Sequence, residues 1–246
     1  MINNTFTIFP AIDLRAGQIV RLAQGDPDRQ TVYGDNPRAQ AQIFKDAGAE
    51  WVHVINLSGA FNEDADANLK ALEGILSVGL KVEFGGGIRD EETLRIPLEM
   101  GVERVFLGTA AIKTPELVDW AIEYFGAERI AGDIGARDGM VMVQGWQEFT
   151  PLTVQAVGHR LYAQGVRWCV LTDVKRDGVG TGVDVSSAVD LQKQTGLQMV
   201  ASGGVSTVED VRRVKDAGLA GVIIGRALYE GKIDLKEVLK EAKSSS

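Results

Sequence analysis

The chain has 246 residues, of which 45% are hydrophobic and 24% charged, so it can bury a sizeable core. Its formal net charge of −8 argues against a nucleic-acid or membrane-surface partner. The single cysteine, Cys169, excludes a disulfide framework within the chain, and the first residues lack the basic start and apolar stretch of a signal peptide. We therefore expect a cytoplasmic protein.

Short apolar runs alternate with longer amphipathic stretches along the chain. Several of the runs are β-branched and continuous, which is typical of buried parallel strands. The clearest amphipathic stretches follow cap-forming residues such as Asn36 and Thr114 or end at a glycine. In chain order, the predicted strands are 7–12, 51–55, 81–84, 104–107, 129–134, 168–172, 198–201 and 221–224, and the clearest predicted helices are 37–47, 91–100, 115–124 and 206–217.

Eight strands that alternate with about eight helices, with no break in composition, indicate the α/β class. They predict a single (β/α)8 TIM barrel that spans residues 1–246 as one domain. A doubly wound open sheet is the alternative.

An internal repeat favours the closed barrel. Residues 83–108 read EFGGGIRDEETLRIPLEMGVERVFLG, and residues 200–225 read VASGGVSTVEDVRRVKDAGLAGVIIG. A Gly-Gly pair, two further glycines and, upstream, a glycine and a tryptophan match at one constant spacing of 117 residues. This register indicates two fused half-barrels, with half-repeats of roughly 1–125 and 126–246.

Each half carries a glycine pattern that suits phosphate. A strand ends in Gly-Gly and leads into a helix, and the next strand ends in a glycine followed by a helical turn. Glycine permits positive φ and close backbone approach, and the N–H groups at a helix start favour an anion. One such pair could simply make a tight turn, but two matched pairs predict a small molecule with a phosphate at each end. The candidate phosphate-binding residues are Gly86, Gly87, Arg89, Gly108 and Thr109 in the first half and Gly203, Gly204, Gly225 and Arg226 in the second.

Two aspartates are candidate proton-transfer groups, because barrel enzymes carry their catalytic groups where strands end. Asp13 directly follows the first apolar strand, although it could instead cap the first loop or pair with Arg15. Asp177 lies in a glycine-rich loop after the sixth strand, although it could be a plain turn residue. His53 is interpreted as a packing residue, and His159 is expected to be exposed on a helix. No metal-ligand spacing or Ser-His-Asp arrangement is evident, so we expect no metal and no cofactor.

Several motifs closely resemble those of the ProFAR isomerase family of histidine biosynthesis. They are FPAIDLRAGQIVRLAQGD, the pair FGGGIR and SGGV, TDVKRDGVGTG and the turn QGW, and the likeness covers essentially the whole chain. The sister cyclase family differs in its cysteine-containing first-strand motif and its fifth-strand loop. The resemblance implies an aldose–ketose isomerase that performs an Amadori rearrangement on a bisphosphate carrying an aminoimidazole carboxamide.

The resemblance also implies roles for single residues. Asp13 matches the family's general base, and Asp177 matches the proposed general acid that helps to open the furanose. Thr172 matches a hydroxyl that assists this acid. Trp146 matches an aromatic residue on a mobile fifth loop that stacks on the substrate.

Two positions depart from the family's pattern. Where the family usually reads Gly-Ile-Asp at the end of the fifth strand, this chain has Asp133 and, two residues later, Gly135. At the end of the second strand Asn56 replaces the family's aspartate. Both changes are interpreted as the loss of a carboxylate from the rim of the site. Because side chains i and i+2 share a face of a strand, Asp133 is expected to point into the barrel as a further candidate catalytic residue.

Three functions stay open at this point. The first is a working isomerase. The second is an engineered or inactivated barrel, derived from the isomerase, that uses a buried carboxylate (Asp133 or Asp13) for another proton abstraction. The third is a phosphosugar-binding barrel without turnover. In each case we expect a monomer whose partner is a small bisphosphate, with no nucleic acid and no membrane.

Overall fold

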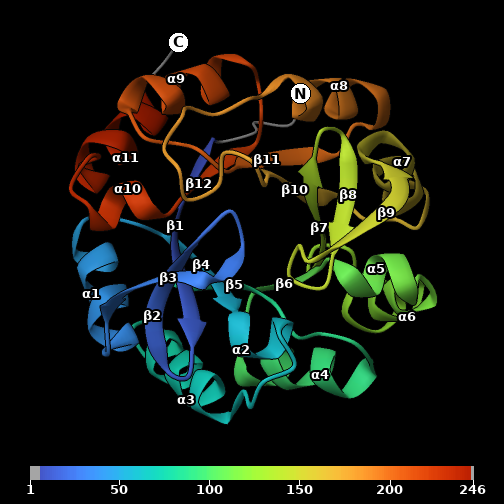
Figure 1. The fold of residues 1–246 in the computed structure, drawn as a ribbon, viewed down its shortest axis with the longest axis horizontal. Helices are drawn as coiled ribbons and strands as arrows, with labels where there is room; N and C mark the ends of the chain where they lie inside the picture. The colour runs from blue at the N-terminus through green and yellow to red at the C-terminus, as the bar shows by residue number, and fades with distance from the viewer. Residues whose placement is uncertain (1–5, 245–246) are drawn as a thin grey trace.

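The computed structural model describes residues 6–244. Its centre is a closed barrel of eight parallel strands, which confirms the predicted TIM barrel (Figure 1). The ring closes where β12 pairs with β1 and where β7 pairs with β10. The barrel strands are β1 (Thr7–Arg15), β4 (Trp51–Asn56), β5 (Lys81–Gly85), β6 (Arg104–Leu107), β7 (Ile130–Arg137), β10 (Trp168–Asp173), β11 (Gln198–Ser202) and β12 (Gly221–Ile224).

Helices surround the strands (Figure 1). The principal helices follow the barrel strands in turn: α1 (Pro37–Asp46), α3 (Asp66–Leu76), α4 (Glu91–Met100), α6 (Glu116–Phe125), α7 (Val154–Ala163), α8 (Ser186–Thr195), α9 (Val208–Asp216) and α11 (Leu235–Lys243). The side chain of Asn36 caps α1 as predicted, by accepting from the backbone N–H of Ala39. The predicted cap Thr114 is wrong, because it ends the short helix α5 (Thr109–Lys113), and α6 begins after Pro115.

Two hairpins and two short helices extend the mouth of the barrel. The hairpins are β2 (Gln18–Ala23) with β3 (Asp26–Gly34), and β8 (Met140–Val143) with β9 (Glu148–Thr153); the helices are α2 (Leu57–Ala60) and α10 (Arg226–Tyr229). Of these, only α10 was predicted, as the helical turn after Gly225. Most residues of β3 and β9 are exposed or half-buried, so these strands lack the continuous apolar run by which a buried strand is recognised.

Side chains that point into the barrel form layers. The apolar layers pack as a cluster of their own: Phe9, Ala11, Phe106, Ala131, Val170, Val200 and Ile223. On β1, Asp13 pairs in register with Ile55 of β4. On β7, Gly135 pairs in register with Thr172 of β10, so both residues lie towards the carboxyl ends of their strands, at the mouth of the barrel. Asp133 stands two residues deeper along β7. The boundaries of the two half-repeats stay a prediction.

Candidate active site

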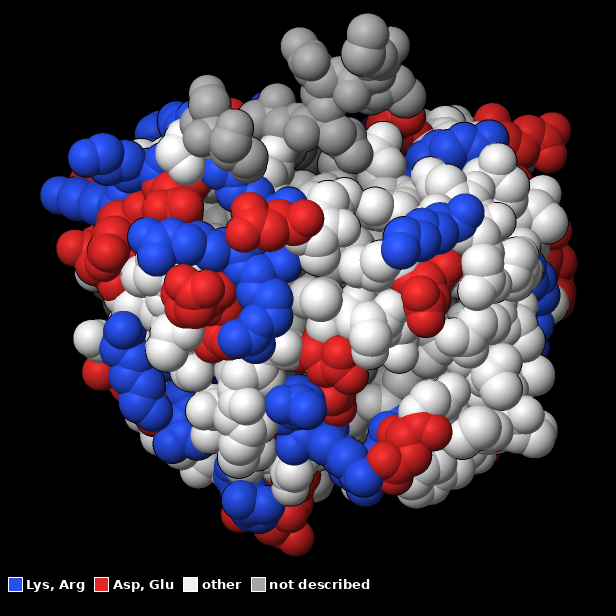
Figure 2. Space-filling view, turned by 90° about the horizontal axis from the view of Figure 1, so that it is seen from above, with Lys and Arg blue, Asp and Glu red and all other residues white. Residues whose placement is uncertain are grey.

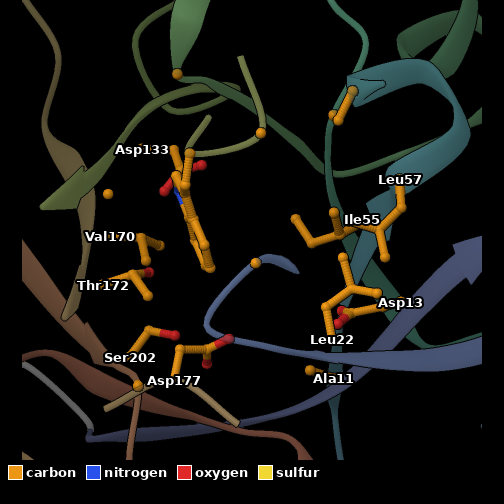
Figure 3. A pocket seen from close by; sticks show the side chains of 18 of the residues that line it. Ala11, Asp13, Leu22, Ile55, Leu57, Asp133, Val170, Thr172, Asp177 and Ser202 are labelled. Carbon is orange, nitrogen blue, oxygen red and sulfur yellow. The ribbon is translucent and has the colours of Figure 1, made fainter. Parts of the chain in front are cut away.

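A cavity of about 460 Å³ opens at the carboxyl ends of the barrel strands and reaches down to the apolar cluster inside the ring. All the candidate site residues line it. They are Asp13, Gly86, Gly87, Arg89, Gly108, Thr109, Asp133, Trp146, Thr172, Asp177, Gly203, Gly204, Gly225 and Arg226. Figure 3 shows Asp13, Asp133 and Asp177 reaching the cavity from different sides.

Asp13 is held by an arginine that sequence reasoning missed. Arg21, on β2, donates to the Asp13 carboxylate at 2.6 Å and to the carbonyl oxygen of Ala11 at 2.5 Å. Its guanidinium lies 5.3 Å from the ring centre of Tyr229, whose hydroxyl donates to the same carbonyl. Arg15, the partner considered from the sequence, forms a different ion pair. Arg21 therefore fixes the orientation of Asp13 at the cavity wall.

Asp177 is the carboxyl group of the cavity that can carry a proton at neutral pH. Burial, together with the negative charge of Asp13, raises the pKa of Asp177 to about 7. A carboxyl group with this pKa keeps its proton in a large share of molecules at neutral pH and can donate it to a substrate. The cavity therefore contains two carboxyl groups in unlike states, one paired with an arginine and one able to carry a proton.

Two hydroxyl groups lie beside Asp177 (Figure 3). Thr172 is the residue before the last of β10, Ser202 is the last of β11, and the two residues pair in the parallel register. Both line the cavity. Sequence reasoning named Thr172 and missed Ser202, although the two-residue alternation along the seventh strand would place Ser202 on the inward face.

The first phosphate corner consists of Gly86, Gly87, Gly108 and Thr109. Gly86 and Gly87 have φ values of +92° and +79°. A Cβ on Gly86 would lie 2.4 Å from the carbonyl oxygen of Asn56, so only glycine fits. The helix α5 starts at Thr109 without a side-chain cap, which leaves its first backbone N–H groups available to an anion.

The second phosphate corner, which consists of Gly203, Gly204, Gly225 and Arg226, repeats this geometry. Gly203 and Gly204 have φ values of +92° and +86°. A Cβ on Gly203 would lie 2.6 Å from the carbonyl oxygen of Asp173. The helix α10 also starts without a side-chain cap. The two corners are therefore built in the same way from backbone groups.

The two arginine side chains at the corners hold the surrounding loops. Arg89 donates to the carbonyl oxygen of Gly59 at 2.6 Å. Arg226 forms an ion pair with Glu230 and donates to the carbonyl oxygen of Gly178, both at 2.5 Å. In this structure the two guanidinium groups therefore hold the loops next to the corners in place.

Trp146 covers part of the cavity mouth in a strained loop. Gln144, Gly145 and Trp146 follow one another in left-handed conformations, with φ values of +55°, +62° and +65°. Such a conformation costs an L-residue about 1–2 kcal/mol. The indole fits because both neighbours are glycines: a Cβ on Gly135 would lie 2.1 Å from the indole Nε1, and a Cβ on Gly25 2.6 Å from its Cε3. Gly135 therefore admits the tryptophan where a side chain would exclude it.

Further contacts hold this loop over the mouth. The backbone N–H of Gln144 donates to the hydroxyl of Thr109 at 2.8 Å, and the Gln147 amide donates to the carbonyl oxygen of Gly25 at 3.1 Å. The turn between β2 and β3 also contacts the loop that follows β10, because the backbone N–H of Gln24 donates to the carbonyl oxygen of Asp177 at 3.0 Å. Three loops therefore close on one another above the carboxylates.

We expect the Gly135→Ala variant to release this loop. The added methyl group overpacks the indole site, which typically costs about 1–3 kcal/mol, so amide exchange in residues 140–149 should speed up by about tenfold or more. Hydrogen–deuterium exchange with mass spectrometry measures it. Gly34→Ala is the matched control, because its Cβ would meet only Ile19, at 3.7 Å. Unchanged exchange in Gly135→Ala would show that Trp146 does not occupy this place.

Asp133 lies deeper in the cavity, beside a buried polar network. Burial raises the pKa of Asp133 to about 6, while the charges of His53 and Glu83 act on it in opposite directions. The Nδ1 atom of His53 lies 2.7 Å from the Glu83 carboxylate, and Arg104 lies 3.5 Å from the same carboxylate. His53 is thus a buried residue with a partner, as predicted, although it also lines the cavity. His159 is exposed, as predicted.

The interpretation of Asn56 as a rim position is wrong. Asn56 is buried, and its side-chain oxygen accepts from the backbone N–H of Gly59 at 2.9 Å and from the Asn68 amide at 2.7 Å. It caps α2 and does not line the cavity. An aspartate at position 56 would accept the same hydrogen bonds but would add a buried charge. The replacement of the family's aspartate by Asn56 therefore affects the loop at α2 and not the proton-transfer groups of the cavity.

Within residues 6–244, no group of three or more His, Cys, Asp and Glu side chains could hold a metal ion. In the same range no helix is both long and apolar enough to cross a membrane.

A closed barrel whose mouth combines acidic side chains with glycine corners is the architecture of an enzyme that acts on a phosphorylated small molecule. The family model described as "Histidine biosynthesis protein" matches residues 7–234, and the chain belongs to this family.

Curated relatives match nearly the whole chain. The chain is 45% identical over 242 residues to a protein of Novosphingobium aromaticivorans, covering 96% of this chain and 99% of that protein. It is 46% identical to one of Sphingopyxis alaskensis, covering 95% and 96%, and 41% identical to one of Bacillus subtilis, covering 98% and 99%. All three are named as isomerases of an imidazole-4-carboxamide that carries a 5-phosphoribosyl and a (5-phosphoribosylamino)methylideneamino group.

Proposed function

We propose that this chain is a ProFAR isomerase of histidine biosynthesis, which converts the aldose end of its substrate into a ketose by an Amadori rearrangement. The observation that carries the proposal is the pair of unlike carboxyl groups, Asp13 and Asp177, in one cavity between two phosphate corners. The names of the relatives support it, because their substrate has two phosphoribosyl ends, one for each corner.

The chemistry follows from the ion pair of Asp13 with Arg21 and from the raised pKa of Asp177. Asp177 donates its proton to the ring oxygen of the aminosugar, the furanose opens, and C1 becomes an iminium carbon. Asp13 then removes the proton from C2, and the electron pair forms the C1–C2 double bond of an enaminol. Return of a proton to C1 and loss of the proton from the C2 hydroxyl give the ketose, with no net change in composition. Thr172 supports Asp177 in the first step.

The loop that carries Trp146 gives the site its cover. We propose that the indole leaves the space above Gly135 when substrate enters and then stacks on the flat imidazole ring. The strain in residues 144–146 supports such a change, since the loop can leave this conformation at little cost once its packing is replaced.

The partner proposed here is a small bisphosphate, handled by a monomer in the cytoplasm. A monomer is supported because one chain supplies every group of the cavity. The formal net charge of −8 counts against a nucleic-acid partner, and Figure 2 shows no extended basic patch on the visible face, where acidic and basic side chains are interspersed mainly on the left.

The direct test is turnover. The purified full chain is incubated with the bisphosphate aldose, and the new ketone carbon is followed by ¹³C NMR. We expect complete conversion to an isomer of equal mass. An unchanged spectrum at high enzyme concentration, with bound phosphate at both corners, would favour a binding protein instead.

A further inference from the structure

One carboxylate in the cavity has no task in the isomerisation and no partner. Of the four acidic side chains that line it, Asp13 is paired with Arg21, Glu230 with Arg226 and Lys232, and Asp177 lies within reach of the charge of Arg21. The side chain of Asp133 has neither a hydrogen bond nor an ion pair with any of residues 6–244. It lies half-buried and faces the cavity.

Apolar side chains line the cavity beside Asp133. Ala11, Phe106, Val170 and Ile223 line the same part of the cavity. Figure 3 places Val170 directly beside Asp133, and Ile55 across the open space from them. The wall therefore suits the faces of a planar group, and the carboxylate lies at its edge.

The indole of Trp146 covers this part of the cavity. It packs where a side chain on Gly135 would project, and Gly135 follows Asp133 by two residues on the same face of β7. An aromatic face next to a carboxylate attracts a planar cation in two ways, through the ring quadrupole and through the opposite charge.

We propose that Asp133, the apolar wall and Trp146 form a second binding subsite, below the isomerisation site, for a planar cation with paired N–H donors of the amidinium class. The carboxylate accepts two parallel N–H hydrogen bonds from the cation, and the apolar wall and the indole cover its faces. A cation is favoured over a neutral donor because it also neutralises a carboxylate that water solvates poorly.

The groups around Asp133 set the pH range of this binding. His53 on β4 and Glu83 on β5 act on its charge, Arg104 on β6 is paired with Glu83, and on β10 the nearest titratable group is the buried thiol of Cys169. Binding requires the ionised carboxylate. Because the pKa of Asp133 is about 6, the affinity should be highest above pH 7 and should fall as the pH drops through 6.

Isothermal titration of the full chain with benzamidine tests the proposal. At pH 8 we expect one site per chain, and Asp133→Asn should weaken it by about tenfold or more, since it removes the charge and keeps the shape. This variant should fold, because it removes a buried charge without an opposite partner. Neutral benzamide should bind at least about tenfold more weakly, and Asp138→Asn, at an exposed position, should change nothing.

Three outcomes would overturn the proposal. They are no binding at millimolar benzamidine, binding that Asp133→Asn leaves unchanged, and binding that is lost in Asp13→Asn but kept in Asp133→Asn, which would place the cation at the isomerisation site. Turnover is measured on the same samples. Because Asp133 takes no part in the proposed isomerisation, failure of benzamidine binding leaves that function untouched, and loss of turnover alone leaves the subsite standing.

Discussion

The Asp13→Asn variant should lose about 10²–10⁴-fold in kcat, because the amide keeps the shape of the carboxylate and cannot remove the C2 proton. The loss should appear in kcat more than in KM, since the corners proposed to hold the phosphates are made of backbone groups away from this side chain. Steady-state kinetics with the bisphosphate substrate measure both constants.

Two controls separate this chemistry from damage to the fold. Asp13→Asn leaves the buried Arg21 without its ion pair, so the thermal midpoint and inhibition by inorganic phosphate are recorded with the rate. Asp35→Asn changes an exposed carboxylate near the end of β3 and should leave all three values unchanged. Near-normal kcat in a folded Asp13→Asn protein would remove Asp13 from the role of base.

The Asp177→Asn variant should lose a similar factor and also change the pH profile. Asp177 acts as an acid only while protonated, and its pKa of about 7 predicts that kcat/KM of the unmodified chain falls as the pH rises above 7. Asparagine has no proton to lose, so the residual activity of the variant should lack this descending limb. The measurement is kcat/KM between pH 5 and 9.

The Asp13→Asn variant gives a second check on the fall of kcat/KM above pH 7. Its negative charge contributes to the raised pKa of Asp177, so in Asp13→Asn the limb should move to lower pH. A limb that persists unchanged in Asp177→Asn would assign it to another group and would leave the general acid unidentified.

The barrel strands could be predicted from the sequence because each is a buried apolar run between turn residues. All eight predicted runs coincide with barrel strands, with ends that differ by up to three residues. The backbone geometry of the proposed phosphate corners could be anticipated for a similar reason. A glycine pair with positive φ is a local requirement of the backbone, and the repeat showed it twice.

The contacts across the mouth could not be predicted, because they join residues that are distant in sequence. Trp146 lies against both Gly25 and Gly135, and nothing in the local pattern of either glycine points to an indole. Arg21 lies on the first strand of a hairpin, and its ion pair with Asp13 depends on how that hairpin folds back against β1. Asn56 was misjudged because its partner Asn68 stands on the next helix.

The central claim is that one cavity binds a phosphate at each end of a substrate and isomerises the sugar between them. It is tested most directly by kcat/KM of the full chain for the bisphosphate aldose and for the two analogues that lack one or the other phosphate. We expect turnover of the bisphosphate and a loss of about 10²-fold or more for each analogue, since binding energy at both ends positions the reacting carbons. No turnover of the bisphosphate, or an analogue that reacts as well as it does, would contradict the claim.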